Sequence, residues 1–272
     1  MNRRFGVLPE KVTYRSNVIE KSHQAVNMDE KGKEGTDFCT ELHEKTKDIH
    51  DKSDKLINLK LAVVLTNKEA WGQAVAQFYY VFQTIEQCIK QHQDHPHVSP
   101  LYIKDLERTK VFEKDLEYYL GPNWQGKLEL TEATKKYCDR IIAATEEDPT
   151  LLVAYSHSMY LALLAGGQII KRIVRKTLGL SGEDGLAIFD FPGSERKDVK
   201  DTLKYNINCM DLTRSQKDMI LKEKRLCFQM NNAIAESVEL KASSFKRLFM
   251  LFVLLLGGFL LILFLFLYMF YY

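Results

Sequence analysis

Residues 151–173 read LLVAYSHSMYLALLAGGQIIKRI, and this stretch decides the fold. Apolar residues recur in it at helical spacing, yet Gly166 and Gly167 stand side by side in its interior. A glycine inside a helix costs about 1 kcal/mol relative to alanine, so something must offset the pair. Two explanations are equally open: another helix packs tightly against Ala162 and Gly166, or the bare backbone admits a kink or a bound group.

The chain on both sides of this stretch is also patterned for helices. Six prolines and fourteen glycines in 272 residues are too few for a many-stranded sandwich or barrel. Asp37 is placed to cap the first helix, and Thr66-Asn-Lys-Glu69 fits a capping box for the second. We predict an all-α fold with helices at about 37–56, 66–91, 101–120, 131–147, 149–178, 194–206 and 213–240.

The balance of charge argues against nucleic acid as a partner. The chain has 38 Lys and Arg against 36 Asp and Glu, a net charge of +2, which gives no broad basic surface. Its five cysteines are scattered without a CxxC pair, as expected for reduced thiols in the cytosol. No apolar run follows the opening MNRRFGVLPEKV, so we expect no secretory signal.

Few motifs suggest chemistry on their own. The sequence has no Gly-rich phosphate loop, GxSxG elbow, HExxH helix or GxGxxG fingerprint. His92, His95 and His97 form an HxxHxH cluster after the second predicted helix, but Pro96 interrupts it. Zinc binding is therefore the weaker alternative to a plain loop at this point.

Residues 248–272, LFMLFVLLLGGFLLILFLFLYMFYY, carry no charge. About 20 apolar residues suffice to span a bilayer as a helix, so we predict a C-terminal transmembrane helix. Lys241, Lys246 and Arg247 precede it and favour the cytosolic side, with the endoplasmic reticulum membrane as the expected location. We divide the chain into a disordered leader (1–35), a helical domain (36–240), a basic juxtamembrane linker (241–247) and a transmembrane tail anchor (248–272).

Two short motifs carry a resemblance to a known family. Tyr160–Gln168, YLALLAGGQ, resembles the distal-helix signature of the haem oxygenases, usually a tyrosine followed by LGDLSGGQ. Glu44–His50, EKTKDIH, resembles the proximal-helix sequence of the same family, which ends at the histidine that ligates haem iron. Further similarity to the family lies in GLAIFDFP at 185–192 and in residues 208–213 and 228–231.

The resemblance spans roughly residues 37–240 and is greatest to the insect branch of tail-anchored eukaryotic haem oxygenases. It implies a single-domain haem oxygenase-like helical fold with haem between the first helix and the glycine-containing helix. It also implies that His50 ligates the iron, although by periodicity alone a histidine at the edge of an apolar face is more often structural. The residues implied to bind haem are His43, His157, Lys200, Lys204 and Phe228, and those implied to act on the distal side are Leu163, Gly166, Gly167 and Asn231.

The sequence departs from the family pattern at several of these positions. His43 stands in place of a lysine and His157 in place of a tyrosine as implied propionate partners. His43 precedes His50 by seven residues, which places it about 10 Å away along a continuous helix. On the distal side, apolar side chains replace three polar ones: Leu163 for an aspartate, Met159 for an arginine and Phe82 for a tyrosine.

The resemblance implies an oxidoreductase that opens haem with O2 and electrons to biliverdin, CO and ferrous iron, haem being both substrate and prosthetic group. Electrons would come from an NADPH-dependent cytochrome reductase on the same membrane face, and biliverdin reductase would act downstream. The loss of the distal carboxylate leaves proton delivery to backbone groups, Asn231 or water, and keeps a haem carrier or sensor open as an alternative. A tail-anchored tethering or fusion protein is a third possibility, but residues 213–240 lack the sustained heptads it needs.

Overall fold

The structure is a computed structural model that describes residues 37–65, 67–191 and 195–238, together with Val253, Gly257, Gly258 and Phe266. The predicted leader (1–35) and juxtamembrane linker (241–247) lie outside these residues, as does nearly all of the predicted transmembrane segment (248–272). The boundaries drawn there remain predictions.

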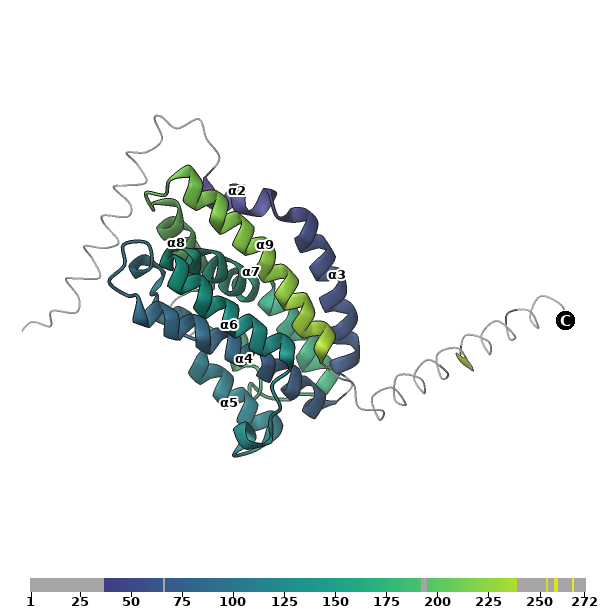
Figure 1. Cartoon of the computed structure of the whole chain (residues 1–272). Coiled ribbons are helices and arrows are strands. Elements are labelled where there is room, and N and C mark those ends of the chain that lie inside the picture. Colours follow the sequence, from purple (N-terminus) through teal and green to yellow (C-terminus); the bar gives the residue numbers. More distant parts are fainter. Residues whose placement is uncertain are drawn as a thin grey trace, which may run out of the picture. The chain divides into compact units, whose positions relative to one another are not determined.

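The described part of the chain is built of helices and contains no strand, which confirms the all-α prediction. Short 3-10 turns join the longer helices, at Ser99–Leu101 (η1), Lys104–Leu106 (η2), Trp124–Lys127 (η3), Pro149–Leu151 (η4) and Ala187–Phe189 (η5). The α-helices are α2 (Phe38–Glu44), α3 (Lys47–Val64), α4 (Lys68–Gln91), α5 (Thr109–Leu120), α6 (Glu132–Glu147), α7 (Leu152–Leu178), α8 (Arg196–Asn208) and α9 (Arg214–Ser237), shown in Figure 1.

The predicted first helix is in fact two helices, α2 and α3, separated by a turn at Lys45 and Thr46. The buried Thr46 hydroxyl donates to the carbonyl oxygen of Leu42 at 2.7 Å, and the Thr46 amide donates to the carbonyl oxygen of His43 at 3.2 Å. A threonine hydroxyl that bonds to the preceding turn competes with the regular backbone ladder. This local competition ends α2, and α3 then begins in a new direction.

Two other predicted boundaries need correction. The range 101–120 contains the last residue of η1, then η2 and α5, because the buried Arg108 side chain donates to the carbonyl oxygens of Leu106 and Asp105 and holds the chain in turns. The N-cap of helix α4 is Asn67, and the predicted cap Thr66 lies outside the described residues. The Asn67 side-chain oxygen accepts from the amides of Glu69 at 2.7 Å and Ala70 at 3.4 Å.

Helix α7, which contains the two glycines, is the central element of the core. It packs against α4, α6, α8 and α9, and its residues 152–160 are buried apart from the half-buried Ser158. Among the described residues, the segment 149–178 is the one helix long and apolar enough to cross a membrane, and 67% of its most apolar window is buried inside the protein. That burial is typical of a core helix.

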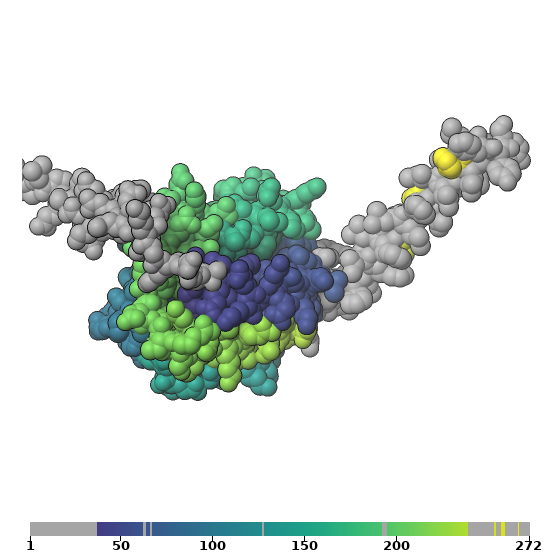
Figure 2. Space-filling view, turned by 90° about the horizontal axis from the view of Figure 1, so that it is seen from above, coloured from purple at the N-terminus to yellow at the C-terminus, as the bar shows by residue number. Residues whose placement is uncertain are grey.

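Helix α3 lies at the surface and packs mainly against α9. Figure 2 shows α2 and α3 as a purple band, with yellow-green α9 along one side and the green atoms of the α7 and α8 region along the other. Of the α3 side chains that the structure describes, Ser53 and Val64 are buried and the others are partly or fully exposed. The proximal helix of the resemblance is thus lightly covered by the rest of the protein.

Candidate functional site

The predicted iron ligand His50 lies on α3 with its ring held from two sides. Its Nδ1 is 3.4 Å from Asp54 Oδ2, one helical turn further along, and 3.9 Å from Asp51 Oδ1. Its ring meets the Phe228 ring of α9 edge to face, with centroids 5.6 Å apart. The side chain is still 41% exposed. With Nδ1 directed to a carboxylate, Nε2 is the nitrogen left for a metal.

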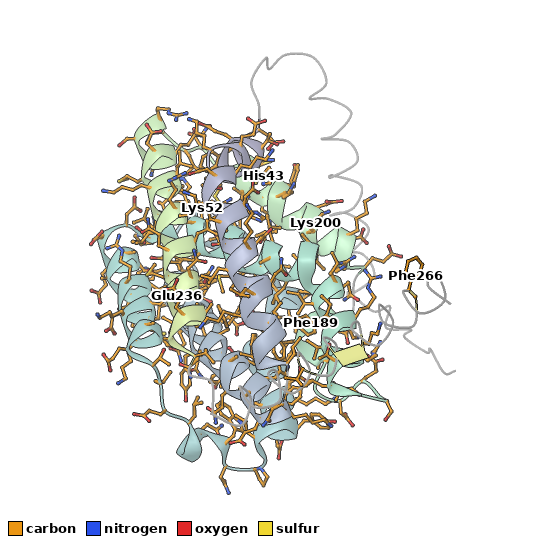
Figure 3. All side chains as sticks on the ribbon, turned by 90° about the vertical axis from the view of Figure 1, so that its right-hand side faces the viewer. His43, Lys52, Phe189, Lys200, Glu236 and Phe266 are labelled. Carbon is orange, nitrogen blue, oxygen red and sulfur yellow. The ribbon has the colours of Figure 1, made fainter. Side chains whose placement is uncertain are left out.

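The rings of His43 and His50 lie close together. Their centroids are 6.2 Å apart, whereas the predicted distance of about 10 Å is the separation of the two residues along the axis of a continuous helix; here a turn at Lys45 and Thr46 separates α2 from α3. Helix α2 is fixed in turn on α8, since the Cys39 amide donates to Asn208 Oδ1 at 2.9 Å. Figure 3 shows His43 and Lys200 of α8 on the same face of the protein, next to α3.

Four basic side chains from four helices form what we call the basic cluster: His43 (α2), His157 (α7), Lys204 (α8) and Lys224 (α9). Lys224 Nζ lies 3.0 Å from His157 Nδ1, and the two residues are only 3% and 5% exposed. Burial, followed by the positive charges of Lys224, Lys204 and His43, lowers the pKa of His157 well below its usual range, and the Cys39 backbone acts weakly in the opposite direction. Three of the predicted propionate contacts are therefore brought together.

The remaining predicted propionate contact, Lys200, lies one turn before Lys204 on α8. Within the described residues neither lysine forms an ion pair with an acidic side chain. Both amines are thus available to an anion that is not part of the protein.

Sequence reasoning missed Lys224, although the sequence contains a signal for it. The buried face of α9 includes Ile220, Cys227 and Ile234, and Lys224 occupies the turn between the first two. A lysine on the apolar face of a helix is almost never fully buried unless it has a partner. Burial lowers the pKa of the Lys224 ammonium from 10.5 to about 8.

The two glycines in α7 have different surroundings. A Cβ atom at Gly166 would meet no other atom within 4 Å, whereas one at Gly167 would lie 3.4 Å from the Phe189 ring. Helix α7 runs through both glycines as a single helix. No described helix packs on Gly166, so tight helix packing does not account for it, and room for a bound group remains.

Phe189 is held against Gly167 by a network around the turn at 185–191. Gln168 Nε2 donates to the carbonyl oxygen of Phe189 at 2.8 Å, and Asp115 of α5 accepts from the amides of Ala187 and Ile188 at 3.1 and 2.8 Å. Gly185 has a φ of +79°, and a Cβ there would lie 2.7 Å from the Tyr119 ring. This turn, which the sequence identified only by resemblance, supports one side of the glycine-containing helix.

The apolar distal positions belong largely to the core. Phe82 packs against Phe112 and Tyr160, with ring centroids 5.1 and 5.5 Å away, and Met159 Sδ accepts from the Tyr137 hydroxyl at 3.6 Å. Leu163 is half-buried and packs on the same core. The positions where the family has a polar network thus form an apolar layer here.

Buried hydroxyl and amide oxygens without a hydrogen bond occur on α7 and α9. They are Ser156 Oγ and Ser158 Oγ of α7 and Asn231 Oδ1 of α9, and Ser158 lies near the Cys227 thiol, where it opposes the rise in pKa that burial causes. Buried polar groups usually have a partner, and an ordered water commonly supplies one. These oxygens are the groups that an ordered water could satisfy.

The histidines after α4 do not form a metal site in the described part of the chain. The His95 and His97 rings are 5.5 Å apart, but His97 Nδ1 lies 3.1 Å from the Thr150 hydroxyl. No group of three or more His, Cys, Asp or Glu side chains suited to a metal occurs among the described residues. These histidines link the end of α4 to η4.

Comparison with known proteins gives the same assignment as the motifs. Residues 36–237 match the family model described as Heme oxygenase. The chain belongs to the haem oxygenase family. A haem oxygenase of Takifugu rubripes is 30% identical over 75% of this chain and 74% of its own length, and one of Pyropia yezoensis is 33% identical over 79% and 90%.

The fold of the family is present as well. The crystal structure of haem oxygenase-1 from the cyanobacterium Synechocystis in complex with haem superposes with a TM-score of 0.73 at 28% identity, covering 81% of this chain and all of the other. Family membership and this fold confirm the predicted enzyme class, an oxidoreductase that produces biliverdin, and haem as its substrate and prosthetic group.

Proposed function

We propose that this chain opens haem to biliverdin, CO and ferrous iron, with His50 as the iron ligand and the ring between α3 and α7. One observation carries the assignment of the site: His50, Phe228, Lys224 and His157 form a continuous line of contacts. It joins an imidazole with a free Nε2 to buried positive charge. A planar group with a metal at its centre and carboxylates at its edge matches that arrangement.

The bound haem supplies the iron at which dioxygen is activated. His50 holds the iron through Nε2, and Asp54 at Nδ1 keeps the imidazole in the tautomer that permits this. Gly166 and Gly167 would keep the α7 side of the site free of side chains and so leave room for dioxygen. The basic cluster and Lys200 receive the propionates.

Proton delivery uses Asn231, Ser158 and backbone groups of α7, through water, because Leu163 offers no carboxylate. General acid catalysis by a positioned group contributes about 10²–10⁴-fold. We therefore infer slower turnover than in relatives with an aspartate there, and attack at more than one meso carbon of the ring.

The apolar layer formed by Phe82, Met159 and Leu163 supports a second candidate function, a haem carrier or sensor. Such a protein would use the same His50 ligand and the same basic cluster. It would bind haem tightly and release no CO on reduction.

We also propose that residues 248–272 anchor the chain in the endoplasmic reticulum membrane with the helical domain in the cytosol. The uncharged run and the basic residues before it support this. An NADPH-dependent cytochrome reductase on that face would supply the electrons, because the sequence has no nicotinamide fingerprint of its own. Biliverdin reductase would consume the product, and the glycine-helix substitutions support an insect-like branch.

The test mixes the full chain, in detergent, with hemin and then adds reductant under oxygen. We expect a Soret band that is lost in His50→Ala and kept in the control His92→Ala, followed by bile pigment and CO. A stable Soret band without CO would assign the carrier function and exclude the oxygenase. A Soret band that is unchanged in His50→Ala would exclude the proposed ligand.

A further inference from the structure

Lys224 and His157 form a buried basic pair without an acidic partner. Lys224 Nζ is 3.0 Å from His157 Nδ1, and no carboxylate in the described part of the chain forms an ion pair with the ammonium. The adjacent Glu223 is already engaged, because it accepts from Arg140 Nε at 3.0 Å, from Arg140 Nη2 at 2.7 Å and from the Tyr155 hydroxyl. The positive charge of Lys224 is therefore not neutralised by its neighbour.

The hydrogen bond between the two side chains fixes where the imidazole proton lies. An ammonium group has donors and no acceptor, so Lys224 must donate and His157 Nδ1 must accept. A neutral imidazole that accepts at Nδ1 carries its proton at Nε2. His157 Nε2 is buried, and the acceptor that acts on the ring is the Cys39 backbone, whose effect on the pKa is weak. The pair thus presents a buried N–H donor next to an ammonium that no described carboxylate neutralises.

Further basic side chains surround Lys224 and His157, and the Phe228 ring lies between Lys224 and His50. Lys204 and His43 both act on His157 as like charges. Lys224 Nζ lies 6.0 Å from the centre of the Phe228 ring, and that ring is in turn 5.6 Å from the His50 ring. Burying a charge without a counter-ion is unfavourable unless an anion completes the site. One aromatic ring therefore separates the predicted iron ligand from a site that requires an anion.

We propose that Lys224 is a positioning residue for one haem propionate: it holds His157 in the tautomer that donates from Nε2 to the carboxylate, and its ammonium balances the carboxylate charge. This inference rests on the proposed function, since it takes haem as the ligand. It adds to the contacts implied by the resemblance, which assign no role to position 224. Lys224 and His157 should therefore favour haem with ionised propionates over haem whose propionates are esterified.

The test compares hemin with hemin dimethyl ester, whose propionates carry no charge, on the full chain. We expect Lys224→Met and His157→Phe to weaken hemin binding about tenfold and to leave diester binding within about twofold. Lys224→Gln, which can still donate to Nδ1 without a charge, should recover part of the preference for hemin. Lys222→Met, at an exposed lysine on the same helix, is the matched control and should behave like the wild type.

The outcomes separate this inference from the proposed function. Equal weakening for both ligands in Lys224→Met, with unchanged thermal unfolding, would overturn the propionate role, as would no weakening at all. Competition by acetate against hemin would assign the pair to small free carboxylates and would also overturn it. Failure of the wild type to give a Soret band that depends on His50 would instead reject the proposed function itself.

Discussion

The imidazole of His50 and the ring of Phe228 meet edge to face, with centroids 5.6 Å apart and an interplanar angle of 74°. The two residues come from α3 and α9, which pack directly on each other. Asp54 approaches the imidazole from its own helix, at Nδ1. The orientation of the proposed iron ligand therefore depends on a contact between two helices as well as on its own helix.

Replacing Phe228 should loosen this orientation. An edge-to-face aromatic pair contributes about 0.5–1.5 kcal/mol beyond its buried area, so Phe228→Leu should weaken hemin binding by about two- to tenfold. A hemin titration followed at the Soret band measures the change. Gln229→Ala, at the exposed next position of α9, serves as the control. Wild-type affinity in Phe228→Leu would show that Asp54 alone orients the ring.

Replacing Gly166 should raise the stability of the haem-free protein and weaken haem binding. A Cβ there meets nothing within 4 Å, so Gly166→Ala should raise the free energy of unfolding of the haem-free protein by about 1 kcal/mol through helix propensity. The same methyl group would occupy the side of α7 proposed to face the ring, and hemin affinity or turnover should fall. Thermal unfolding and hemin titration on one preparation measure both effects. A gain in stability with no loss of hemin affinity or turnover would show that the porphyrin ring does not lie against Gly166.

Restoring a carboxylate at position 163 should restore proton delivery. Leu163→Asp should increase the yield of biliverdin per haem consumed and narrow the mixture of ring-opened isomers, because a fixed carboxylate orders the distal water. Chromatography of the bile pigments measures both. Leu161→Asp, at a similarly half-buried leucine two residues earlier, is the control and should not improve the yield. Equal yields in the two variants would indicate that Asn231 and backbone groups already suffice.

The sequence predicted those features that depend on neighbours along the chain. The helical periodicity of residues 149–178 and the order of the two motifs were enough for the fold class, for haem as the substrate and for the glycine-containing helix. The turn at Thr46 was missed because it depends on one hydroxyl that bonds to the Leu42 carbonyl, an option open to any threonine. Lys224 was missed for another reason: its partner His157 lies 67 residues away.

Lys224 should destabilise the protein when haem is absent. Burial lowers its pKa from 10.5 to about 8, so the unfolded chain holds this proton more tightly than the folded chain does. The buried ammonium therefore lowers the free energy of unfolding. This loss is complete below about pH 8 and disappears as the pH rises toward 10.5. We expect Lys224→Met to stabilise the haem-free protein by about 1–2 kcal/mol at pH 7, after the loss of the His157 hydrogen bond is counted.

The advantage of Lys224→Met should shrink as the pH rises from 8 to 10.5, because the wild-type lysine then loses its charge. Denaturant unfolding at several pH values measures this difference. Lys222→Met, at an exposed site, should change little at any pH. A destabilised Lys224→Met variant at pH 7 would assign the lysine an ordinary structural role.

The stability that depends on Asp115 should fall as the pH rises, whereas the stability that depends on Lys224 rises with pH, and the two changes occur in different pH ranges. Burial raises its pKa from 3.8 to about 6, against the opposing effect of the amides of Ile188 and Ala187. The folded chain therefore holds this proton more tightly than the unfolded chain. The stability that results is full below about pH 4 and is lost as the pH rises through 6.

Asp115→Asn removes this titration and leaves one oxygen for two amides, so the turn at 185–191 loses a hydrogen bond. The loss of stability in this variant should be larger at pH 4 than at pH 7, and the difference between the two losses should be about 2–3 kcal/mol. Asp184→Asn, in the exposed part of the same loop, should show no such dependence. Because this turn presses Phe189 on Gly167, hemin affinity should fall with stability in Asp115→Asn. An unchanged affinity would show that the glycine-containing helix keeps its position without the turn.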